Sequence, residues 1–420
     1  MRSTKTLTAD LVVVGGGAAG LFAALVAARR GLDVVLLEPG RRPGHKLCLT
    51  GKGRCNLTND CEPRAFLENV LRNPKFLQGV LHRFPPAMAM EFFEELGVPL
   101  KTERGARVFP VSDKARDVAD ALQTAVRRAG VRVLNKRAMR IETSRGRVTG
   151  VAMQGERVSC RAALLCTGGL SYPATGSTGD GYRMAATLGH SIVTPRPSLV
   201  PLETDGPAAA LQGLSLRNVT LSAFDESGAL FFREFGELLF THFGVSGPLV
   251  LSASARLPAL DAGGRCRLSI DMKPALDEKK LDERILRDFA QYANRDFRNA
   301  LGDLLPQKLI PVIIERSGIP GETKVNTVTK AQRHSLIACM KDFSLSVLRA
   351  RPMAEAVITA GGVSVSELNP RTMESHLVRG LYFAGEIIDV DACTGGFNLQ
   401  IAWSTAHAAA SSIPKEADND

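Results

Sequence analysis

The distribution of apolar residues predicts a buried parallel sheet near the N-terminus. Residues 10–14 and 33–37 are short runs of Val and Leu that each begin at an Asp, the pattern of strands buried on both faces. Residues 21–30 between them are mostly apolar and are followed by Gly31, as expected of a helix and its C-terminal cap. These segments form a strand–helix–strand unit of about thirty residues.

Similar runs further along the chain extend this sheet. Residues 162–166 and 380–384 have the same buried-strand pattern, so the end of the chain returns to the first sheet. Between them, residues 192–272 carry many Pro, Gly and Ser among alternating apolar positions, whereas residues 273–334 are charged and have helical periodicity. We therefore expect an α/β fold in which a Rossmann-like domain is interrupted by a β-rich domain and a small helical domain.

The composition is that of an ordinary globular protein. Of 420 residues, 45% are hydrophobic and 23% are charged. The net charge of +10 would suit an anionic partner, but acidic and basic residues are interleaved along the chain. One Trp and four Tyr are too few for a surface that stacks nucleic-acid bases. We expect a small-molecule substrate and consider nucleic acid an unlikely partner.

Cysteine spacing and one apolar run bear on the cellular compartment. The eight cysteines are scattered without zinc-binding spacing, which indicates reduced thiols and no metal site. Residues 11–28 resemble a membrane span, but four glycines with the spacing of a phosphate loop lie in this run. A buried strand and helix explain the run better, so we expect a cytoplasmic protein without a membrane partner.

A glycine fingerprint follows the first predicted strand. It reads Gly15-x-Gly17-x-x-Gly20, and Glu38 lies at the end of the second strand. The first glycine permits a tight turn, the second lets backbone approach a pyrophosphate, and the third lets helix and strand pack closely. The N-terminus of the helix offers free N–H groups to the diphosphate, and Glu38 can accept the ribose hydroxyls. The pattern therefore predicts a dinucleotide cofactor.

A second set of residues follows the last predicted strand. Gly385-Glu386-x-x-Asp389 comes directly after it, and the run Thr394-Gly-Gly-Phe-Asn-Leu-Gln400 follows, with another helix expected to start near Asn398. The N–H groups of that helix can face the flavin N1–C2=O edge, where negative charge collects on reduction. A nicotinamide dehydrogenase would instead place a catalytic domain after the fingerprint, so FAD is favoured. Asp389 or Asp391 could equally cap the helix or contact a ligand.

The loop after the second strand contains cations and thiols. Lys46 and Arg54 are candidates for contacts with the phosphates or the flavin edge. Cys48 and Cys55 could form a redox dithiol, but six residues separate them, a wider spacing than disulfide reductases use. We expect a packed or flavin-adjacent free thiol, and we retain Cys55 as a candidate catalytic residue.

His242 is the candidate titrating group in the middle of the chain. It lies in Thr-His-Phe-Gly-Val-Ser-Gly-Pro, whose glycines suggest a turn that could cover the flavin, and the alternative is a structural role beside the aromatic residue. The predicted cofactor-binding residues are Gly15, Gly17, Ala18, Ala19, Gly20, Glu38, Lys46, Arg54, Asn56, Thr167, Gly168, Gly385, Glu386, Asp389, Gly396, Phe397, Asn398 and Leu399.

Four longer motifs make the chain similar to a known family. Residues 13–20, 51–59, 240–248 and 380–400 resemble those of the bacterial BaiN-like, or aminoacetone-oxidase-like, FAD-dependent oxidoreductases, and residues 358–363 are similar too. The matches span nearly the whole chain. The resemblance implies a glutathione-reductase-type FAD domain that is interrupted by a β-barrel domain and a helical domain.

The changes in composition and periodicity along the chain, together with the family resemblance, give the expected domain limits. We place the FAD-binding domain at residues 1–191 and 352–420, the barrel-like substrate domain at 192–272 and 335–351, and the helical domain at 273–334.

The predicted activity is hydride transfer between a small organic substrate and flavin N5, either by amine oxidation or by reduction of an activated C=C bond. FAD is expected to be non-covalent, because no His or Cys lies in a recognisable linkage motif. Residues 190–350 contain no second glycine fingerprint, so NAD(P)H would bind only transiently as an electron donor. Two alternatives are an RNA-binding flavoprotein of tRNA modification, suggested by the pI of about 9.3, and a flavin–thiol redox sensor.

Overall fold

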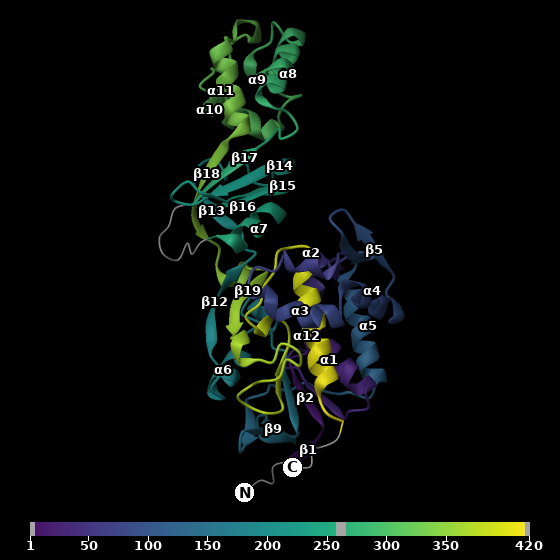
Figure 1. The fold of residues 1–420 in the computed structure, drawn as a ribbon. Helices are drawn as coiled ribbons and strands as arrows, with labels where there is room; N and C mark the ends of the chain where they lie inside the picture. Colours follow the sequence, from purple (N-terminus) through teal and green to yellow (C-terminus); the bar gives the residue numbers. More distant parts are fainter. Residues whose placement is uncertain (1–4, 258–265, 416–420) are drawn as a thin grey trace. The chain divides into compact units, whose positions relative to one another are not determined.

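The computed structural model describes residues 5–257 and 266–415 (Figure 1). Its contacts divide the chain into two compact units. The first contains residues 1–198 and 353–420, and the second contains residues 199–352.

The boundary between the units lies later than residue 192, where the sequence suggested it. Strand β12 (Ile192–Ser198) pairs with β19 (Ile358–Val363), and both strands belong to the first unit. An antiparallel partner more than 150 residues away cannot be recognised from the local composition of the chain. This explains why the predicted boundary was placed before β12.

The first unit is built on a five-stranded parallel sheet of order β20-β11-β2-β3-β7. Residues of the central strand are buried on both faces, as its apolar run predicted. Crossovers leave this strand in both directions, so the carboxyl edge between β2 and β11 is the position where open α/β sheets bind ligands. The strands are β2 (Leu11–Val14), β3 (Val34–Leu37), β7 (Arg132–Leu134), β11 (Ala162–Leu165) and β20 (Leu381–Phe383).

Two helices from opposite ends of the sequence lie side by side against this sheet (Figure 1). Helix α1 (Ala18–Arg29) and helix α12 (Phe397–Ser412) are buried over most of their length, since both are predominantly apolar. The Phe22 and Trp403 rings, with centroids 5.6 Å apart, join the two helices. Helix α5 (Ala115–Arg128) covers α1 with its apolar face.

The remaining elements of the first unit form smaller sheets and short helices around this core. One sheet has the order β1-β10-β9-β8 and another the order β4-β6-β5. The strands are β1 (Lys5–Thr8), β4 (Thr58–Asn59), β5 (Leu100–Glu103), β6 (Arg107–Pro110), β8 (Arg140–Ser144), β9 (Arg147–Ala152) and β10 (Glu156–Ser159). The helices are α2 (Pro63–Leu67), α3 (Pro74–Arg83), α4 (Pro86–Glu95) and α6 (Asp180–Thr187).

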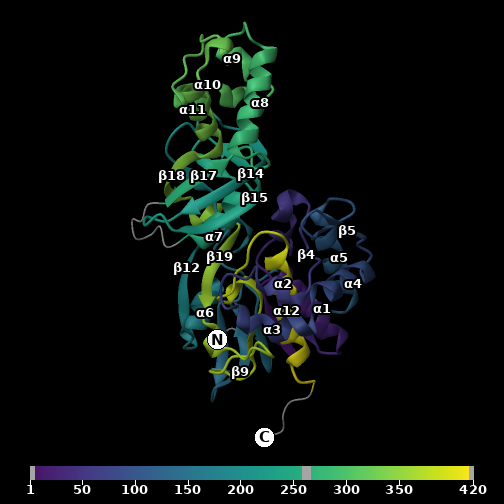
Figure 2. The same ribbon diagram turned by 45° about the horizontal axis from the view of Figure 1, so that its top comes forward.

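The second unit contains a closed barrel of order β13-β16-β15-β14-β17-β18, seen in Figure 2. This confirms the β-barrel that the family resemblance implied. The strands are β13 (Leu202–Thr204), β14 (Ser215–Phe224), β15 (Leu230–Thr241), β16 (Gly244–Ser246), β17 (Cys266–Asp271) and β18 (Phe343–Ala350).

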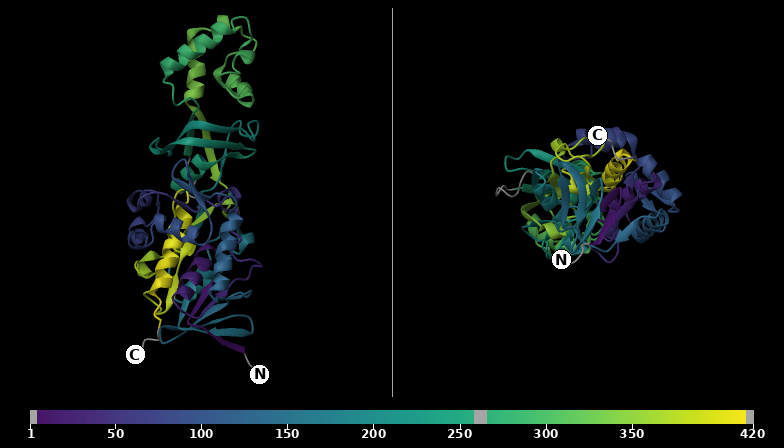
Figure 3. Two further views of the ribbon diagram at one scale, coloured as in Figure 1. Left: turned by 90° about the vertical axis from the view of Figure 1, so that its right-hand side faces the viewer. Right: turned by 90° about the horizontal axis from the view of Figure 1, so that it is seen from below.

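Helices complete the second unit. They are α7 (Pro248–Arg256), α8 (Glu278–Gln291), α9 (Phe297–Ala300), α10 (Ile310–Ser317) and α11 (Lys330–Lys341). Helices α8 to α11 lie together next to the barrel, in the upper part of the left view of Figure 3, whereas α7 packs separately against β15. Barrel residues such as Leu268 and helical residues such as Ile285 belong to the same hydrophobic cluster. Separate barrel and helical domains therefore stay a prediction.

Candidate active site

Two glycines of the fingerprint permit very close backbone packing. A Cβ on Gly20 would lie 1.8 Å from Gly15 O, and a Cβ on Gly15 would lie 2.5 Å from Cys166 O. Both distances are too short for any real side chain, and Gly15 also has a φ of +100°. Helix α1 can therefore begin against β2 and β11 only because both positions are glycine.

Gly17 has a different role. A Cβ on Gly17 would have no heavy atom within 4 Å, and its φ of −76° suits any residue. The position opens onto free space at the start of α1, whose first residues Ala18 and Ala19 have no side-chain cap above them. The helix N–H groups are therefore available to an anion. Gly385 lies close to this turn, because its Cβ would be 2.9 Å from Ala19 Cβ.

Glu38 is fixed at the end of β3 by two backbone donors. Gly16 N donates to Oε2 and Gly40 N donates to Oε1, both at 2.7 Å. Each carboxylate oxygen retains a free lone pair, because an ionised carboxylate accepts about four hydrogen bonds. The carboxylate is thus held in place without being saturated, as a ribose-binding acid requires.

A cavity of about 220 Å³ lies beside Glu38. Its walls combine aliphatic residues with Arg41 and Arg127, a combination that suits a flat aromatic ring such as adenine. The lining residues are Leu21, Glu38, Gly40, Arg41, Pro43, Gln123, Val126, Arg127, Val133 and Asn135.

The start of helix α12 is the second helix N-terminus of the site. Gly396 has a φ of +98°, and its Cβ would lie 2.2 Å from Thr58 O, so the helix starts directly against β4. With its amide oriented to match its neighbours, Asn56 accepts from Gly396 N at 3.0 Å. Asn398 holds the preceding loop by accepting from Ala392 N at 3.0 Å. No side chain caps the first turn, so its N–H groups remain free for a ligand.

The other two residues predicted in this helix have separate roles. The Phe397 ring packs edge-on against Phe66 with centroids 5.0 Å apart, so only its backbone can face a cofactor. Leu399 is partly buried beside the hydrophobic core.

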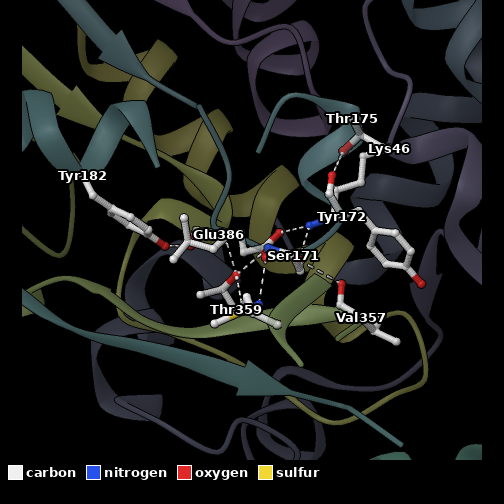
Figure 4. Close-up of polar contacts among 10 residues, drawn as sticks. Lys46, Ser171, Tyr172, Thr175, Tyr182, Val357, Thr359 and Glu386 are labelled. Atoms are coloured by element: carbon white, nitrogen blue, oxygen red, sulfur yellow. Dashed lines mark hydrogen bonds and ion pairs between the residues drawn. The ribbon is translucent and has the colours of Figure 1, made fainter. Parts of the chain in front are cut away.

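Lys46 and Glu386, predicted as separate cofactor contacts, form an ion pair with each other (Figure 4). Lys46 Nζ lies 2.7 Å from Glu386 Oε2 and donates to Ser171 Oγ at 2.7 Å. Ser171 Oγ donates to Glu386 Oε1 at 2.9 Å, and Thr359 N donates to the same oxygen at 2.8 Å. Four distant chain segments therefore meet at one carboxylate.

Thr359 and Ser171 were not recognised from the sequence. The Thr359 hydroxyl accepts from Leu170 N at 2.7 Å and from Ser171 N at 3.1 Å, which fixes the loop after β11. A Cβ on Gly169 would lie 2.3 Å from Thr359 Oγ1, so the loop passes very close to β19. The similarity of residues 358–363 to the family was the one signal that could have indicated this role.

The same loop contains Thr167 and Gly168, both predicted as cofactor contacts. Gly168 has a left-handed φ of +69°. Thr167 Oγ1 is buried and has no hydrogen-bond partner among the described residues. It lies beside α6, because a Cβ on Gly181 would be 2.0 Å from it. The cofactor contact of these two residues stays a prediction.

Arg54 is held by acidic partners. Its Nε donates to Asp113 at 2.9 Å and its Nη1 donates to Glu103 at 3.2 Å, while the guanidinium lies 4.1 Å from the centre of the Phe109 ring. The Arg54 hydrogen bond holds the pKa of Glu103 below its ordinary value. Arg54 therefore anchors its loop to β5 and β6, and its predicted contact with the flavin edge is not tested.

The two thiols of the loop are poor nucleophiles in this structure. Cys55 is completely buried, and burial raises its pKa to about 12. Burial also raises the pKa of Cys48, which is partly exposed. Since the thiolate is the reactive form, both groups stay protonated near neutral pH. This geometry does not favour a catalytic role for Cys55 or a redox pair.

We expect Cys48→Ser to change turnover by less than about tenfold, roughly 1.4 kcal/mol of barrier. Two-electron reduction should bleach the flavin without a long-wavelength charge-transfer band, because burial raises the pKa of both Cys48 and Cys55 and keeps them in the thiol form. Anaerobic titration followed by absorbance detects the band, and a steady-state assay of the variant and the wild type measures turnover. If Cys48→Ser lost several orders of magnitude of turnover while FAD stayed bound, the result would instead indicate thiol chemistry.

His242 lies in the second unit, where its ring is exposed and 4.9 Å from the Phe243 ring centre. Its predicted catalytic role stays untested. Among the described residues, no group of three or more His, Cys, Asp or Glu is arranged to hold a metal ion. Within the same residues, no helix is long and apolar enough to cross a bilayer.

The site fits FAD on four independent features of the first unit. They are a free helix N-terminus at Gly17, a fixed acid at Glu38, a ring-sized cavity beside it, and a second free helix N-terminus at Gly396. A Rossmann-type sheet with these features defines a flavin-dependent oxidoreductase.

The chain belongs to the HI0933-like family of Rossmann-domain proteins, whose model matches residues 9–412. This confirms the predicted resemblance to BaiN-like flavoproteins. A 3-dehydro-bile acid delta(4,6)-reductase of Clostridium scindens is 31% identical over 415 residues, which cover 94% of this chain and 97% of that protein.

Two further proteins are similar over nearly the whole chain. A ribosomal RNA dihydrouridine synthase of Escherichia coli is 31% identical over 410 residues, which cover 96% of this chain and 98% of that protein. The structure of 3-ketosteroid-Δ4-(5α)-dehydrogenase from Rhodococcus jostii has a TM-score of 0.51 at 16% identity, covering 99% of each chain. The latter likeness supports the fold.

Proposed function

We propose that this enzyme reduces a C=C bond conjugated to a carbonyl group, with FAD as the hydride carrier. The observation that carries the proposal is the uncapped start of α12 at Gly396. Its N–H groups and dipole would stabilise negative charge at the flavin N1–C2=O edge, where a bound reduced flavin carries its charge. The uncapped start therefore supports hydride chemistry on a flavin that passes through its reduced anion, and the direction of the reaction is inferred from the relatives.

The names of the relatives support reduction over amine oxidation. The Clostridium scindens protein is named as a reductase of delta(4,6) double bonds in a 3-dehydro bile acid, and the Escherichia coli protein is named as a synthase of dihydrouridine. Both names describe hydrogen addition to a C=C bond next to a carbonyl group. We infer the same reaction class for this chain.

The residues of the first unit bind and orient the cofactor. Glu38 would accept the ribose hydroxyls, the α1 N-terminus would bind the diphosphate, and the α12 N-terminus would hold the pyrimidine edge of the flavin. Lys46 and Glu386 would line the path between these points. When bound, FAD supplies hydride from N5 to the β carbon of the activated bond, and a proton must reach the α carbon.

A uridine in RNA is the second candidate substrate, because the basic charge is unevenly distributed. Residues 102–161 contain 14 Lys and Arg but 6 Asp and Glu, so this segment accounts for a surplus of 8 out of the net +10. Arg116, Arg128 and Arg145 are exposed within it. Exposed basic residues would attract a phosphate backbone with strong salt dependence.

One experiment separates these candidates. Enzyme reduced under anaerobic conditions is mixed with a 4,6-dien-3-one steroid, with a uridine-containing RNA, or with buffer, and flavin reoxidation is followed by absorbance. We expect rapid reoxidation by one of the two conjugated substrates. Oxidised enzyme mixed with an amine should stay oxidised. Flavin bleaching by the amine, without reoxidation by either conjugated substrate, would contradict the proposal.

A further inference from the structure

Buried charged groups with unmatched atoms lie in the segment before helix α12. Asp389 is 8% exposed and Asp391 is 0% exposed. Their Oδ1 atoms and Arg72 Nη1 are buried and have no hydrogen-bond partner among the described residues. Buried polar atoms are nearly always paired, so three unmatched atoms in one cluster require a physical explanation. Asp389 stays a predicted cofactor contact, and the function described above gives no role to Arg72 or Asp391.

Two antiparallel segments hold the cluster rigidly. Leu71 N donates to Asp391 O at 2.8 Å, and Cys393 N donates to Asn69 O at 2.9 Å. The residues around Arg72 therefore run alongside those around Asp391. This backbone pairing fixes the distance between the guanidinium and the carboxyl groups.

The Asp391 carboxyl group has few stabilising contacts for a buried anion. Ser198 Oγ donates to Oδ2 at 3.0 Å, and Arg72 Nε lies 3.7 Å from Oδ1, which is too long for a hydrogen bond. Burial raises the pKa of Asp391 and outweighs the lowering effects of Arg72, the Ser198 hydrogen bond and Arg196, and the negative charge of Asp389 raises this pKa further. Oδ1 is thus an oxygen on which a proton can reside.

The cluster is joined directly to the flavin end of the site. Asn398, in the first turn of α12, donates to Ala392 O at 2.8 Å and accepts from Ala392 N at 3.0 Å. Ala392 follows Asp391 in the chain. Negative charge at the start of α12 therefore acts on Asp391 through a short, ordered and largely buried segment, where electrostatic screening is weak.

We propose that Asp391 is a redox-linked proton site that takes up one proton when the flavin is reduced and releases it on reoxidation. Reduction brings two electrons and one proton to the cofactor, and a second proton from solvent converts the Asp391 carboxylate to the acid. Arg72 and Asp389 are positioning residues that set the proton affinity. If the proposed function holds, the released proton matches the one needed at the substrate α carbon.

The test is the pH dependence of the FAD midpoint potential in the holoprotein without substrate. For a two-electron couple each proton contributes about 30 mV per pH unit, so the wild type should show about 59 mV per pH unit where Asp391 titrates and Asp391→Asn about 30. The reduced-minus-oxidised infrared spectrum should contain a protonated carboxyl band that Asp391→Asn lacks. Glu68→Gln, an exposed acid nearby, should match the wild type.

Three further results test the proposal. Ser198→Ala removes a hydrogen bond that lowers the pKa of Asp391. The pH range in which the midpoint potential changes by about 59 mV per pH unit should therefore move to higher pH. A steep slope retained in Asp391→Asn would place the second proton on flavin N1, which the reduced-flavin absorbance reports, and would overturn the proposal. The proposal would also be overturned if the wild-type midpoint potential changed by only about 30 mV per pH unit, the value for one proton, and the infrared spectrum lacked the protonated carboxyl band. Since no substrate is used, none of these results depends on the proposed reaction.

Discussion

Gly17→Val should leave the fold intact and abolish FAD binding. A Cβ at this position has no heavy atom within 4 Å and the backbone needs no left-handed conformation, so the apoprotein accepts the side chain. The isopropyl group would occupy the space through which the α1 N–H groups reach the diphosphate. We expect the FAD Kd to rise at least about 100-fold, roughly 2.8 kcal/mol.

Fluorescence titration of apoprotein with FAD measures this effect, and chemical denaturation of the apoprotein measures stability. Gly20→Ala is the matched control, because its Cβ would lie 1.8 Å from Gly15 O and should lower the free energy of unfolding. The two variants should thus separate binding from folding. Full FAD loading of Gly17→Val would show that the turn does not hold the diphosphate.

Trp403→Ala should cause the largest loss of stability in the first unit. The side chain is completely buried between Phe22 and Phe93, with ring centroids 5.6 and 5.1 Å away. Removing a buried aromatic side chain typically lowers the free energy of unfolding by about 3–5 kcal/mol. At about 2–4 °C per kcal/mol for a domain of this size, Tm should fall markedly in a thermal melt of the apoprotein.

Trp403→Phe tests the polar part of this contact. Trp403 Nε1 donates to Leu57 O at 3.0 Å and so ties α12 to the loop next to Asn56. Phenylalanine retains most of the packing but leaves a buried carbonyl unpaired, at a cost of about 1–3 kcal/mol of unfolding free energy.

For the larger truncation, equal stability of Trp403→Ala and wild type would contradict the placement of α12 in the core.

The parts of the site that the sequence predicted are local in the chain. Gly15, Gly17 and Gly20 lie within six residues, and Glu38 follows at the end of the next strand. A tight turn, a close helix and a strand end each impose a residue type at a fixed spacing. The same reasoning predicted a helix start near Asn398, close to the observed start of α12 at Phe397, since a helix N-terminus needs only its own first turn.

The partners of charged residues did not follow from spacing. Lys46 and Arg54 are both cations of one loop and received the same predicted role, yet Lys46 pairs with Glu386, 340 residues away, while Arg54 pairs with Glu103 and Asp113. Ionic partners are chosen by proximity in space, which the chain order does not encode locally. The pairing of Asp391 with Ser198 and Arg72 is hidden from the sequence for the same reason.

The sequence by itself determined the strand–turn–helix at the N-terminus, the return of the chain to the same sheet and the flavoprotein family, because periodicity and glycine sterics are short-range properties. Only the tertiary structure decided that Thr359 and Ser171 lock the loop after β11 and that Cys55 is buried. It also decided that β12 belongs to the first unit. Each of these facts depends on which distant segments pack together, and a side chain acquires its burial, partners and pKa only when that packing forms.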